Sequence, residues 1–385
     1  MQHLQVSFWE HEVFFKDIDV IIIGSGIVGL SAALHLKTSA PDLKVVILER
    51  GIYPYGASTR NAGFACFGTL SEICRDLNSY SEDEVFSMVE KRWNGLTNLR
   101  QIVGDEKSEF EMCGSHELFF SNEENKYSEY ISKIDYINNK IETITGIAEN
   151  FSIADNAIKD FNFNNIKHLI ASKSEGLIHS GRAIKTLLKR AQDAGVEILN
   201  SIEVKLFQEE EENKVIITTT NGLTINTKKL LIATNGFTNK LIKNIDVVPA
   251  RGQVIVTSPI INLKVKGAFH FDEGFYYFRN VGNRILFGGG RNLNLKGEET
   301  SEFGLTDEIQ KKLEQYLKEV ILPESHFSID YRWSGIMGMG SSRTVIMKNI
   351  SENISCAVRL SGTGVAIGTL IGREAAENIL DSMDN

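Results

Sequence analysis

The sequence predicts an α/β protein in which a Rossmann-like dinucleotide-binding domain carries a second lobe built on an antiparallel sheet. Two observations lead to this fold class. A strand, a glycine-rich turn, a helix and a second strand follow one another near the start of the chain, and a glycine-rich turn with a helix closes it. Between these ends, short β-like runs alternate with polar turns, a pattern typical of antiparallel pairing.

The first strand–helix–strand unit covers residues 19–49. Residues 19–23 form a short β-branched run that ends at Gly24, as expected of a buried parallel strand. Residues 29–37 carry helix formers with apolar spacing, and residues 44–49 form a second buried strand. Together these segments predict a βαβ unit.

The same patterns predict the later elements. Apolar periodicity predicts helices over residues 83–100, 182–194 and 364–380, and helices are also expected over residues 306–320 and over the charged stretch 124–144. Strands are expected over residues 116–121, 196–199, 204–208, 214–219, 229–233, 254–258, 275–279 and 284–288, with a further strand that ends at 359–362. The acidic residues 209–212 are expected to form a solvated hairpin turn. We assign residues 1–95, 165–245 and 340–385 to a discontinuous dinucleotide-binding domain, and residues 96–164 and 246–339 to a substrate-binding domain.

Composition argues against several classes of protein. A net charge of −9, from 41 basic and 50 acidic residues, disfavours nucleic acid as a partner. Four scattered cysteines and eight dispersed histidines show no metal-binding spacing, so we expect no metal and reduced thiols. The chain opens without a signal-peptide pattern. Residues 20–36 are interrupted by glycines and fall short of the roughly 20 residues of a membrane span, so we expect a cytoplasmic protein.

A GxGxxG motif lies where a dinucleotide would need it. It comprises Gly24, Gly26, Ile27, Val28 and Gly29, between the first strand and the first helix. The first glycine permits a tight turn, the second lets a pyrophosphate approach the backbone, and the third lets helix and strand pack closely. Glu49, at the end of the next strand, is placed to bind an adenosine ribose and to repel a 2′-phosphate. The motif therefore leaves FAD and NAD open.

Further segments resemble the D-amino-acid oxidase superfamily, and within it the gamma-glutamylputrescine oxidase-type and glycine/sarcosine oxidase-like amine oxidases. The matching segments, in the order of the family, are residues 56–64, 176–182, 233–236, 249–253 and 361–366. This resemblance implies an FAD-binding domain of the glutathione-reductase type. It places the following residues at the cofactor: Arg50, Ser58, Thr59, Arg60, Asn61, Ala62, Gly63, Val204, Ala233, Thr234, Asn235, Gly236, Gly335, Gly362, Thr363, Gly364, Val365 and Ala366.

Two residues are candidates for catalysis. Residues 276–279 and 284–290 resemble the substrate-lobe hairpin of the family, and residues 333–337 followed by Arg343 resemble its returning segment over the flavin. Alternation places Tyr276 and Tyr277 on opposite faces, and we assign Tyr276 to the pocket wall, with ordinary sheet packing as the alternative. Arg343 is assigned to a substrate carboxylate or the flavin edge, with a surface salt bridge as the alternative. The proline and glycine that follow this arginine in the family are absent here, which leaves its role open.

Three absences refine the expected chemistry. Amino-acid oxidases of the family carry a carboxylate-binding arginine just after the Trp-x-Gly segment, where this chain has residues 336–338 without one. No cysteine occurs there, so FAD is expected to be noncovalent, and Leu286 stands near the place of the lysine that speeds oxygen reduction. The resemblance thus implies oxidation of a small amine by hydride transfer to flavin N5, with oxygen or another electron acceptor. An NAD-dependent dehydrogenase and a non-catalytic FAD-binding assembly protein remain alternatives.

Overall fold

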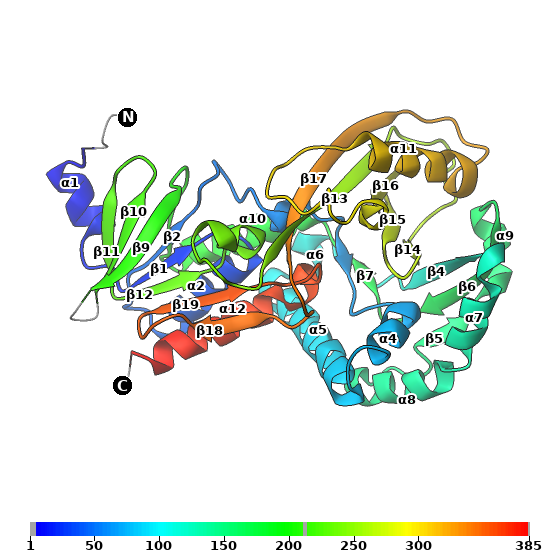
Figure 1. Ribbon diagram of the computed structural model, residues 1–385, viewed down its shortest axis with the longest axis horizontal. Helices are drawn as coiled ribbons and strands as arrows, with labels where there is room; N and C mark the ends of the chain where they lie inside the picture. The colour runs from blue at the N-terminus through cyan, green and yellow to red at the C-terminus, as the bar shows by residue number, and fades with distance from the viewer. Residues whose placement is uncertain (1–4, 211–213, 384–385) are drawn as a thin grey trace.

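A six-stranded sheet forms the core of one half of the molecule in the computed structural model, which describes residues 5–210 and 214–383 (Figure 1). Its order is β18-β19-β12-β1-β2-β8, and every neighbouring pair is parallel except β18 with β19. The strands are β1 (Val20–Ile23), β2 (Val45–Leu48), β8 (Glu197–Leu199), β12 (Lys229–Ile232), β18 (Ile346–Asn349) and β19 (Ile354–Val358). The three central strands β1, β2 and β12 are buried throughout, because both faces of the sheet are covered.

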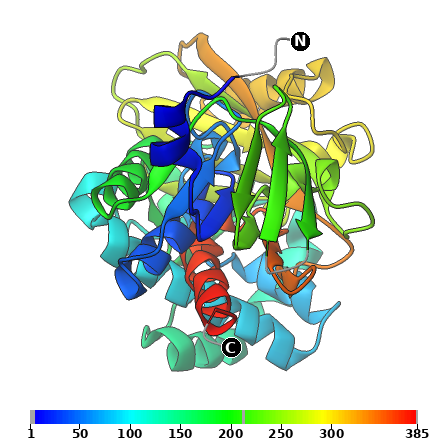
Figure 2. The same cartoon turned by 90° about the vertical axis from the view of Figure 1, so that its left-hand side faces the viewer.

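Helices cover one face of this sheet and a small sheet covers the other. The helices are α2 (Ile27–Ser39), α5 (Glu82–Val103), α10 (Ser180–Asp193) and α12 (Gly364–Asp381). The antiparallel sheet on the other face contains β9 (Val204–Glu210), β10 (Lys214–Thr219) and β11 (Thr224–Thr227), seen in green in Figure 2. Alternation along β1 sends Val20 and Ile22 toward the helices and Ile21 and Ile23 toward the small sheet.

An eight-stranded sheet forms the other half, in the order β17-β13-β16-β15-β14-β4-β6-β5 (Figure 1). Its strands are β4 (Ser115–Phe120), β5 (Phe151–Ile153), β6 (Ile166–Ser172), β13 (Val248–Thr257), β14 (Ala268–Phe271), β15 (Tyr276–Val281), β16 (Arg284–Gly289) and β17 (Ile329–Met339). Strands β4 and β14 are parallel, whereas the other neighbours are antiparallel. The prediction of an antiparallel sheet is therefore wrong at this one pair, which joins strands about 150 residues apart in the chain.

Two groups of helices cover the second sheet. On one face, α11 (Asp307–Tyr316) and the short π-helix η6 (Leu317–Ile321) pack on the aromatic core of β14, β15 and β16. The other group comprises α4 (Leu70–Leu77), α7 (Glu124–Ile131) and α8 (Ile134–Thr145). Shorter elements complete the chain: α1 (Phe8–Glu10), η1 (His11–Phe15), α3 (Ala57–Arg60), β3 (Phe64–Ala65), α6 (Asp105–Ser108), η2 (Ser121–Glu123), η3 (Asp155–Ala157), α9 (Ile158–Phe161), β7 (Gly176–Leu177), η4 (Asn235–Lys240) and η5 (Arg291–Leu293).

Several predicted boundaries differ from the structure. The helix expected over residues 124–144 is two helices, because the Ser132 hydroxyl donates to the carbonyl of Glu129 (2.6 Å) and the chain turns there. Strand β6 belongs to the eight-stranded sheet, although we assigned residues 165–245 to the other domain. The last strand ends at Val358, before residues 359–362. The assigned domain limits otherwise stay a prediction.

The acidic stretch also differs from its predicted form. Glu209 and Glu210 lie within β9, and the Glu209 carboxylate accepts hydrogen bonds from the backbone and side-chain amides of Asn353 (3.0 and 2.7 Å). Glu209 therefore ties β9 to the loop before β19 and is not part of a solvated turn. Glu211 and Glu212 lie outside the described residues.

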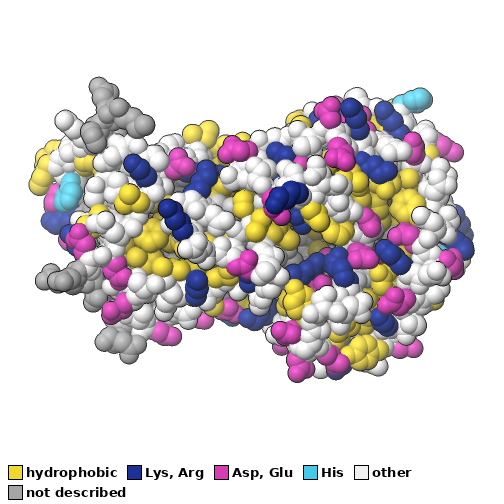
Figure 3. Space-filling view, in the orientation of Figure 1, with side chains coloured by type: hydrophobic (Ala, Val, Ile, Leu, Met, Phe, Trp, Pro, Cys, Tyr) yellow, Lys and Arg dark blue, Asp and Glu magenta, His cyan; other side chains and the backbone are white. Residues whose placement is uncertain are grey.

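The surface shows no extended region of a single charge on the face drawn in Figure 3, where acidic and basic side chains are intermingled. A group of basic side chains lies near the middle of that face, between the two halves. Within residues 5–210 and 214–383, no helix is both long enough and apolar enough to cross a membrane.

Candidate functional site

One cavity of about 420 Å³ lies between the two large sheets. Loops that follow the carboxyl ends of β1, β2, β12 and β19 form one part of its wall, and residues of β13, β15 and β17 form another. Ligands of open parallel sheets bind at this end of the strands. The site therefore lies where both halves of the molecule contribute residues.

The structure brings nearly all predicted cofactor residues to this cavity. The following line it: Gly24, Gly26, Ile27, Val28, Glu49, Arg50, Ser58, Arg60, Asn61, Ala62, Gly63, Val204, Ala233, Thr234, Asn235, Gly236, Gly335, Gly362, Thr363, Gly364, Val365 and Ala366. Two do not. Thr59 turns its hydroxyl to the carbonyl of Pro54 (2.7 Å), within its own loop. Gly29 lies behind the cavity, against the turn itself.

The first turn has the geometry that a bound pyrophosphate requires. Gly24 has a φ of +105°, which side-chain-bearing residues rarely adopt. A Cβ on Gly29 would lie 2.0 Å from the carbonyl oxygen of Gly24, so helix α2 packs on the turn only with glycine there. The first amides of α2 have no partners within the helix and form a ready anion site, although that of Ile27 donates to the Ser58 hydroxyl (2.9 Å).

Glu49 is buried and already holds the turn together. One carboxylate oxygen accepts hydrogen bonds from the backbone amide of Ser25 (3.0 Å) and from its hydroxyl (2.8 Å). The other accepts from the amide of Gly51 (2.8 Å). Because a carboxylate oxygen has two lone pairs, the oxygen facing Gly51 keeps one for a ribose hydroxyl. Glu49 thus combines a structural role with its predicted place at the cavity.

The closing turn supplies a second set of donors. Arg359, Ser361 and Gly362 have φ values of 63°, 47° and 83°, and helix α12 then begins without a side-chain cap. The side-chain oxygen of Asn235 accepts from the amides of Arg359 and Leu360 (3.0 and 3.2 Å), which fixes this turn to the end of β12. The buried Ser361 hydroxyl lines the cavity yet has no hydrogen-bond partner among the described residues. An orphaned donor and uncapped amides fit a bound polar ring edge.

Tyr276 does not face the cavity, so its assignment to the pocket wall is wrong. Its side chain packs in the core under α11, with its ring stacked on Phe271 at 4.8 Å and edge-on to Tyr316 at 5.0 Å. The next residue, Tyr277, lines the cavity and meets Phe64 edge-on at 5.6 Å. Burial raises the pKa of Tyr277 to about 12, so its hydroxyl stays protonated.

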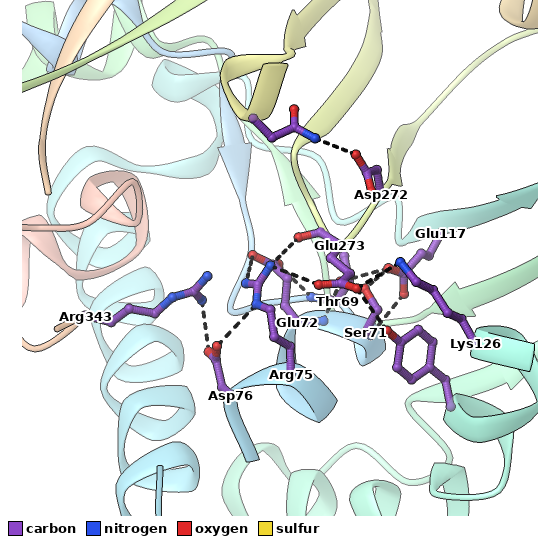
Figure 4. Close-up of polar contacts among 12 residues, drawn as sticks. Thr69, Ser71, Glu72, Arg75, Asp76, Glu117, Lys126, Asp272, Glu273 and Arg343 are labelled. Carbon is purple, nitrogen blue, oxygen red and sulfur yellow. Dashed lines mark hydrogen bonds and ion pairs between the residues drawn. The ribbon is translucent and has the colours of Figure 1, made fainter. Parts of the chain in front are cut away.

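Arg343 does line the cavity, within a network that crosses from one half of the molecule to the other (Figure 4). Its guanidinium pairs with the buried Asp76 of α4 at 2.9 Å. Asp76 also lies 3.7 Å from Arg75, which donates to the carbonyl of Glu273 (2.9 Å). Burial raises the pKa of Asp76 although both arginines oppose this. The alternative of a salt bridge is therefore observed, with a buried partner in place of a surface one.

Sequence reasoning missed several cavity residues. His270 of β14 lines the cavity and pairs with the buried Glu175 at 3.1 Å. Burial alone would lower the pKa of His270, but the Glu175 carboxylate raises it overall. Cys66, Glu72 and Arg291 also line the cavity. These residues come from segments distant in the chain and carry no motif. Only their juxtaposition in the fold identifies them.

Comparison with known proteins shows to which family the chain belongs. The family model DAO, described as FAD dependent oxidoreductase, matches residues 19–378. The chain belongs to this family. A probable oxidoreductase OrdL from Haemophilus influenzae is 25% identical over 94% of this chain and 83% of its own length. Gamma-glutamylputrescine oxidoreductase from Escherichia coli is 28% identical over 93% and 83%. The crystal structure of L-proline dehydrogenase from P. horikoshii superposes with a TM-score of 0.73 at 19% identity, covering 96% and 94% of the two chains.

This FAD-dependent oxidoreductase has a cavity whose residues fit its cofactor. The glycine turn before α2, the ribose-facing carboxylate of Glu49 and the uncapped start of α12 match the pyrophosphate, ribose and ring of FAD in chemistry. Family membership identifies FAD, and not NAD, as the dinucleotide. The NAD-dependent alternative is therefore wrong.

Proposed function

We propose that this FAD-dependent oxidoreductase oxidises the C–N bond of a small amine or amino-acid derivative. The observation that carries the proposal is the shared cavity: Phe64, Tyr277 and Val254 line the same space as the residues assigned to the flavin. The similarity to the gamma-glutamylputrescine oxidoreductase over most of the chain supports an amine as donor. FAD, when bound, supplies a hydride acceptor at N5.

The protein's own residues would hold the amine, orient its C–H bond and exclude water. Phe64 and Tyr277 form an apolar wall, and the Tyr277 hydroxyl offers one hydrogen bond. The loop that carries Arg60 is held rigidly, since the Trp333 indole donates to the Arg60 carbonyl (2.9 Å). The Arg60 guanidinium donates to the Ser334 carbonyl and lies 4.7 Å from the ring centre of Phe303.

Noncovalent FAD is part of the proposal, even though Cys66 lines the cavity. Burial, together with the charges of Glu175 and Glu72, raises the pKa of Cys66 well above its usual value. A protonated thiol is a poor nucleophile, which argues against a flavin–cysteine bond. Leu286 is buried in an apolar cluster, so no lysine is available there for oxygen activation. We propose a cytoplasmic enzyme that uses oxygen or another electron acceptor.

Anaerobic titration of the purified yellow holoenzyme tests this function. A panel of primary amines, secondary amines and N-alkyl amino acids is added. Reduction of the flavin is followed as the loss of its visible absorbance at about 450 nm. We expect at least one amine to bleach the flavin fully and reoxidation to depend on the acceptor supplied. A flavin that stays oxidised with every compound would support the non-catalytic alternative instead.

A further inference from the structure

Arg291 differs from the other arginines around the substrate half of the cavity. Arg75 and Arg343 both pair with Asp76, and Arg92 is buried close to Glu72, which raises its pKa against the effect of burial. Arg75 also lies 3.6 Å from the carboxylate of Glu273, so each of these three charges has a carboxylate nearby. Arg291 lines the same cavity, but in the described part of the chain its guanidinium makes neither a hydrogen bond nor an ion pair.

The acidic residues whose charges act on Arg291 already have other partners. Glu298 pairs with Arg251 at 2.7 Å, and Glu299 lies 3.8 Å from Lys296. Their fields raise the pKa of Arg291, yet burial outweighs them and lowers it below its ordinary value. The guanidinium is thus half-buried and has no counter-charge of its own. Such a buried charge costs free energy unless a ligand supplies an opposite charge.

The backbone around Arg291 is held in place. It opens the short turn η5, just after Gly290, which has a left-handed φ of 76°. The next side chain, Asn292, donates to the carboxylate of Asp272 (2.8 Å), the residue at the top of Figure 4. This bond joins η5 to the β14–β15 turn, which itself is tied to Arg75 through Glu273. The backbone that carries Arg291 is therefore held by the fold.

We propose that Arg291 binds a carboxylate of the substrate, so that the substrate is an amino-acid derivative and not a simple amine. The inference rests on the proposed function, which makes this cavity the substrate site. Tyr277 lines the same space, and its protonated hydroxyl can donate to the same anion. A guanidinium binds a carboxylate through two parallel hydrogen bonds. Arg75 and Arg343 already pair with carboxylates of the protein, whereas the Arg291 guanidinium has no carboxylate partner among the described residues. The anion site lies on the turn after β16, whereas the resemblance would place it on β17.

Calorimetric titration of the oxidised holoenzyme with unreactive ligands tests this assignment. Benzoate and propionate are compared with benzamide and propionamide, which have the same shape without the charge. The proteins are the wild type, Arg291→Gln, Arg291→Lys and the control Arg284→Gln, whose arginine pairs with Asp330 outside the cavity. We expect Arg291→Gln to weaken carboxylate binding by about 30-fold or more, Arg291→Lys to weaken it less, and the control to leave it unchanged. Binding of the amides should not change.

Two results would overturn the proposal. One is equal affinity of the wild type for benzoate and benzamide; the other is unchanged benzoate binding by Arg291→Gln with full FAD content. If Arg291→Gln does not fold, the wild-type pair and Arg291→Lys still decide. These titrations involve no turnover. A holoenzyme that binds benzoate through Arg291 but is reduced by no amine would contradict the proposed function alone, whereas rapid bleaching by amines without benzoate binding would contradict this inference alone.

Discussion

Tyr276 and Tyr277 are adjacent in β15 and point to opposite faces of the eight-stranded sheet. The Tyr276 ring fills the aromatic core below α11, where its neighbours are Phe271 and Tyr316. The Tyr277 ring lies against Gly288 of the next strand, because a Cβ on that glycine would meet it at 2.5 Å. Strand alternation separates the two tyrosines, but only the packing of α11 decides which one is buried.

We expect Tyr277→Phe to lower kcat/KM for the best amine about 10-fold, because the substrate loses one hydrogen bond worth about 1 kcal/mol or slightly more. Steady-state kinetics and melting temperature are measured together. Tyr276→Phe is the matched control, since it removes a hydroxyl from the neighbouring core position. An equal loss of kcat/KM in both variants would show that the effect comes from the sheet and not from the cavity.

The buried Glu117 should make the stability of the folded protein depend on pH. It is buried in β4, accepts hydrogen bonds from Ser71 and Thr69, and burial raises its pKa to about 7. A carboxyl group with a raised pKa in the folded state stabilises the fold below its unfolded pKa, and this contribution is lost as pH rises toward 7. Glu117→Gln should therefore flatten the change in the free energy of unfolding between about pH 4.5 and pH 7 by up to about 3 kcal/mol, followed as the melting temperature at each pH. An identical pH profile in variant and wild type would contradict this.

The predicted residues that line the cavity are mostly those whose backbone conformation defines a motif. Gly24, Gly26 and the turn at 361–366 are recognisable because a dinucleotide-binding turn requires glycines and free amides at such positions. His270 and Arg343 reach the cavity from separate segments, and each pairs with a buried carboxylate, Glu175 and Asp76 respectively. No spacing pattern in the sequence predicts these pairs, because they form only when α4 and β14 pack in the folded protein.

At the scale of elements, α5 and α12 approach each other closely at one glycine. A Cβ on Gly95 would lie 2.2 Å from the carbonyl oxygen of Ala366, in the first turn of α12. Helix α5 therefore supports the segment of α12 that lines the cavity. Helices α2, α5 and α12 follow their predicted periodicity because local apolar spacing determines them. The parallel pairing of β4 with β14 is a long-range contact that no local pattern encodes.

Gly95→Ala should destabilise the protein by about 1–3 kcal/mol, because the added methyl group forces α5 away from α12. It should also weaken FAD binding, since the first turn of α12 would shift. Gly181→Ala is the control: this glycine is exposed in α10, and its added Cβ would meet only the His179 ring at 3.4 Å. That change should stabilise by about 0.5–1 kcal/mol through helix propensity. Thermal melting with fluorescence titration of FAD distinguishes the two, and equal melting temperatures would contradict the close contact.

At the scale of the whole molecule, the cavity receives residues from both large sheets, so FAD bound there would contact both halves. Gly24 and Ala366 belong to the half around the six-stranded sheet, whereas Gly335 belongs to β17 of the eight-stranded sheet. Strand β17 also contacts Arg60, because the Trp333 indole bonds to that loop. Binding energy at this site is thus linked to the relative placement of the two halves.

We expect FAD to raise the melting temperature of the apoprotein in proportion to the logarithm of its concentration, with about 4 kcal/mol gained at 1,000 times Kd. FMN, which lacks the adenosine that Glu49 is placed to bind, should stabilise much less at equal concentration. Hydrogen exchange of apo and holo protein then locates the effect. Protection should increase at the turn after β1, at the start of α12 and along β17. Protection confined to the six-stranded sheet would show that the cofactor does not bridge the two halves, and equal stabilisation by FMN would contradict the adenosine contact of Glu49.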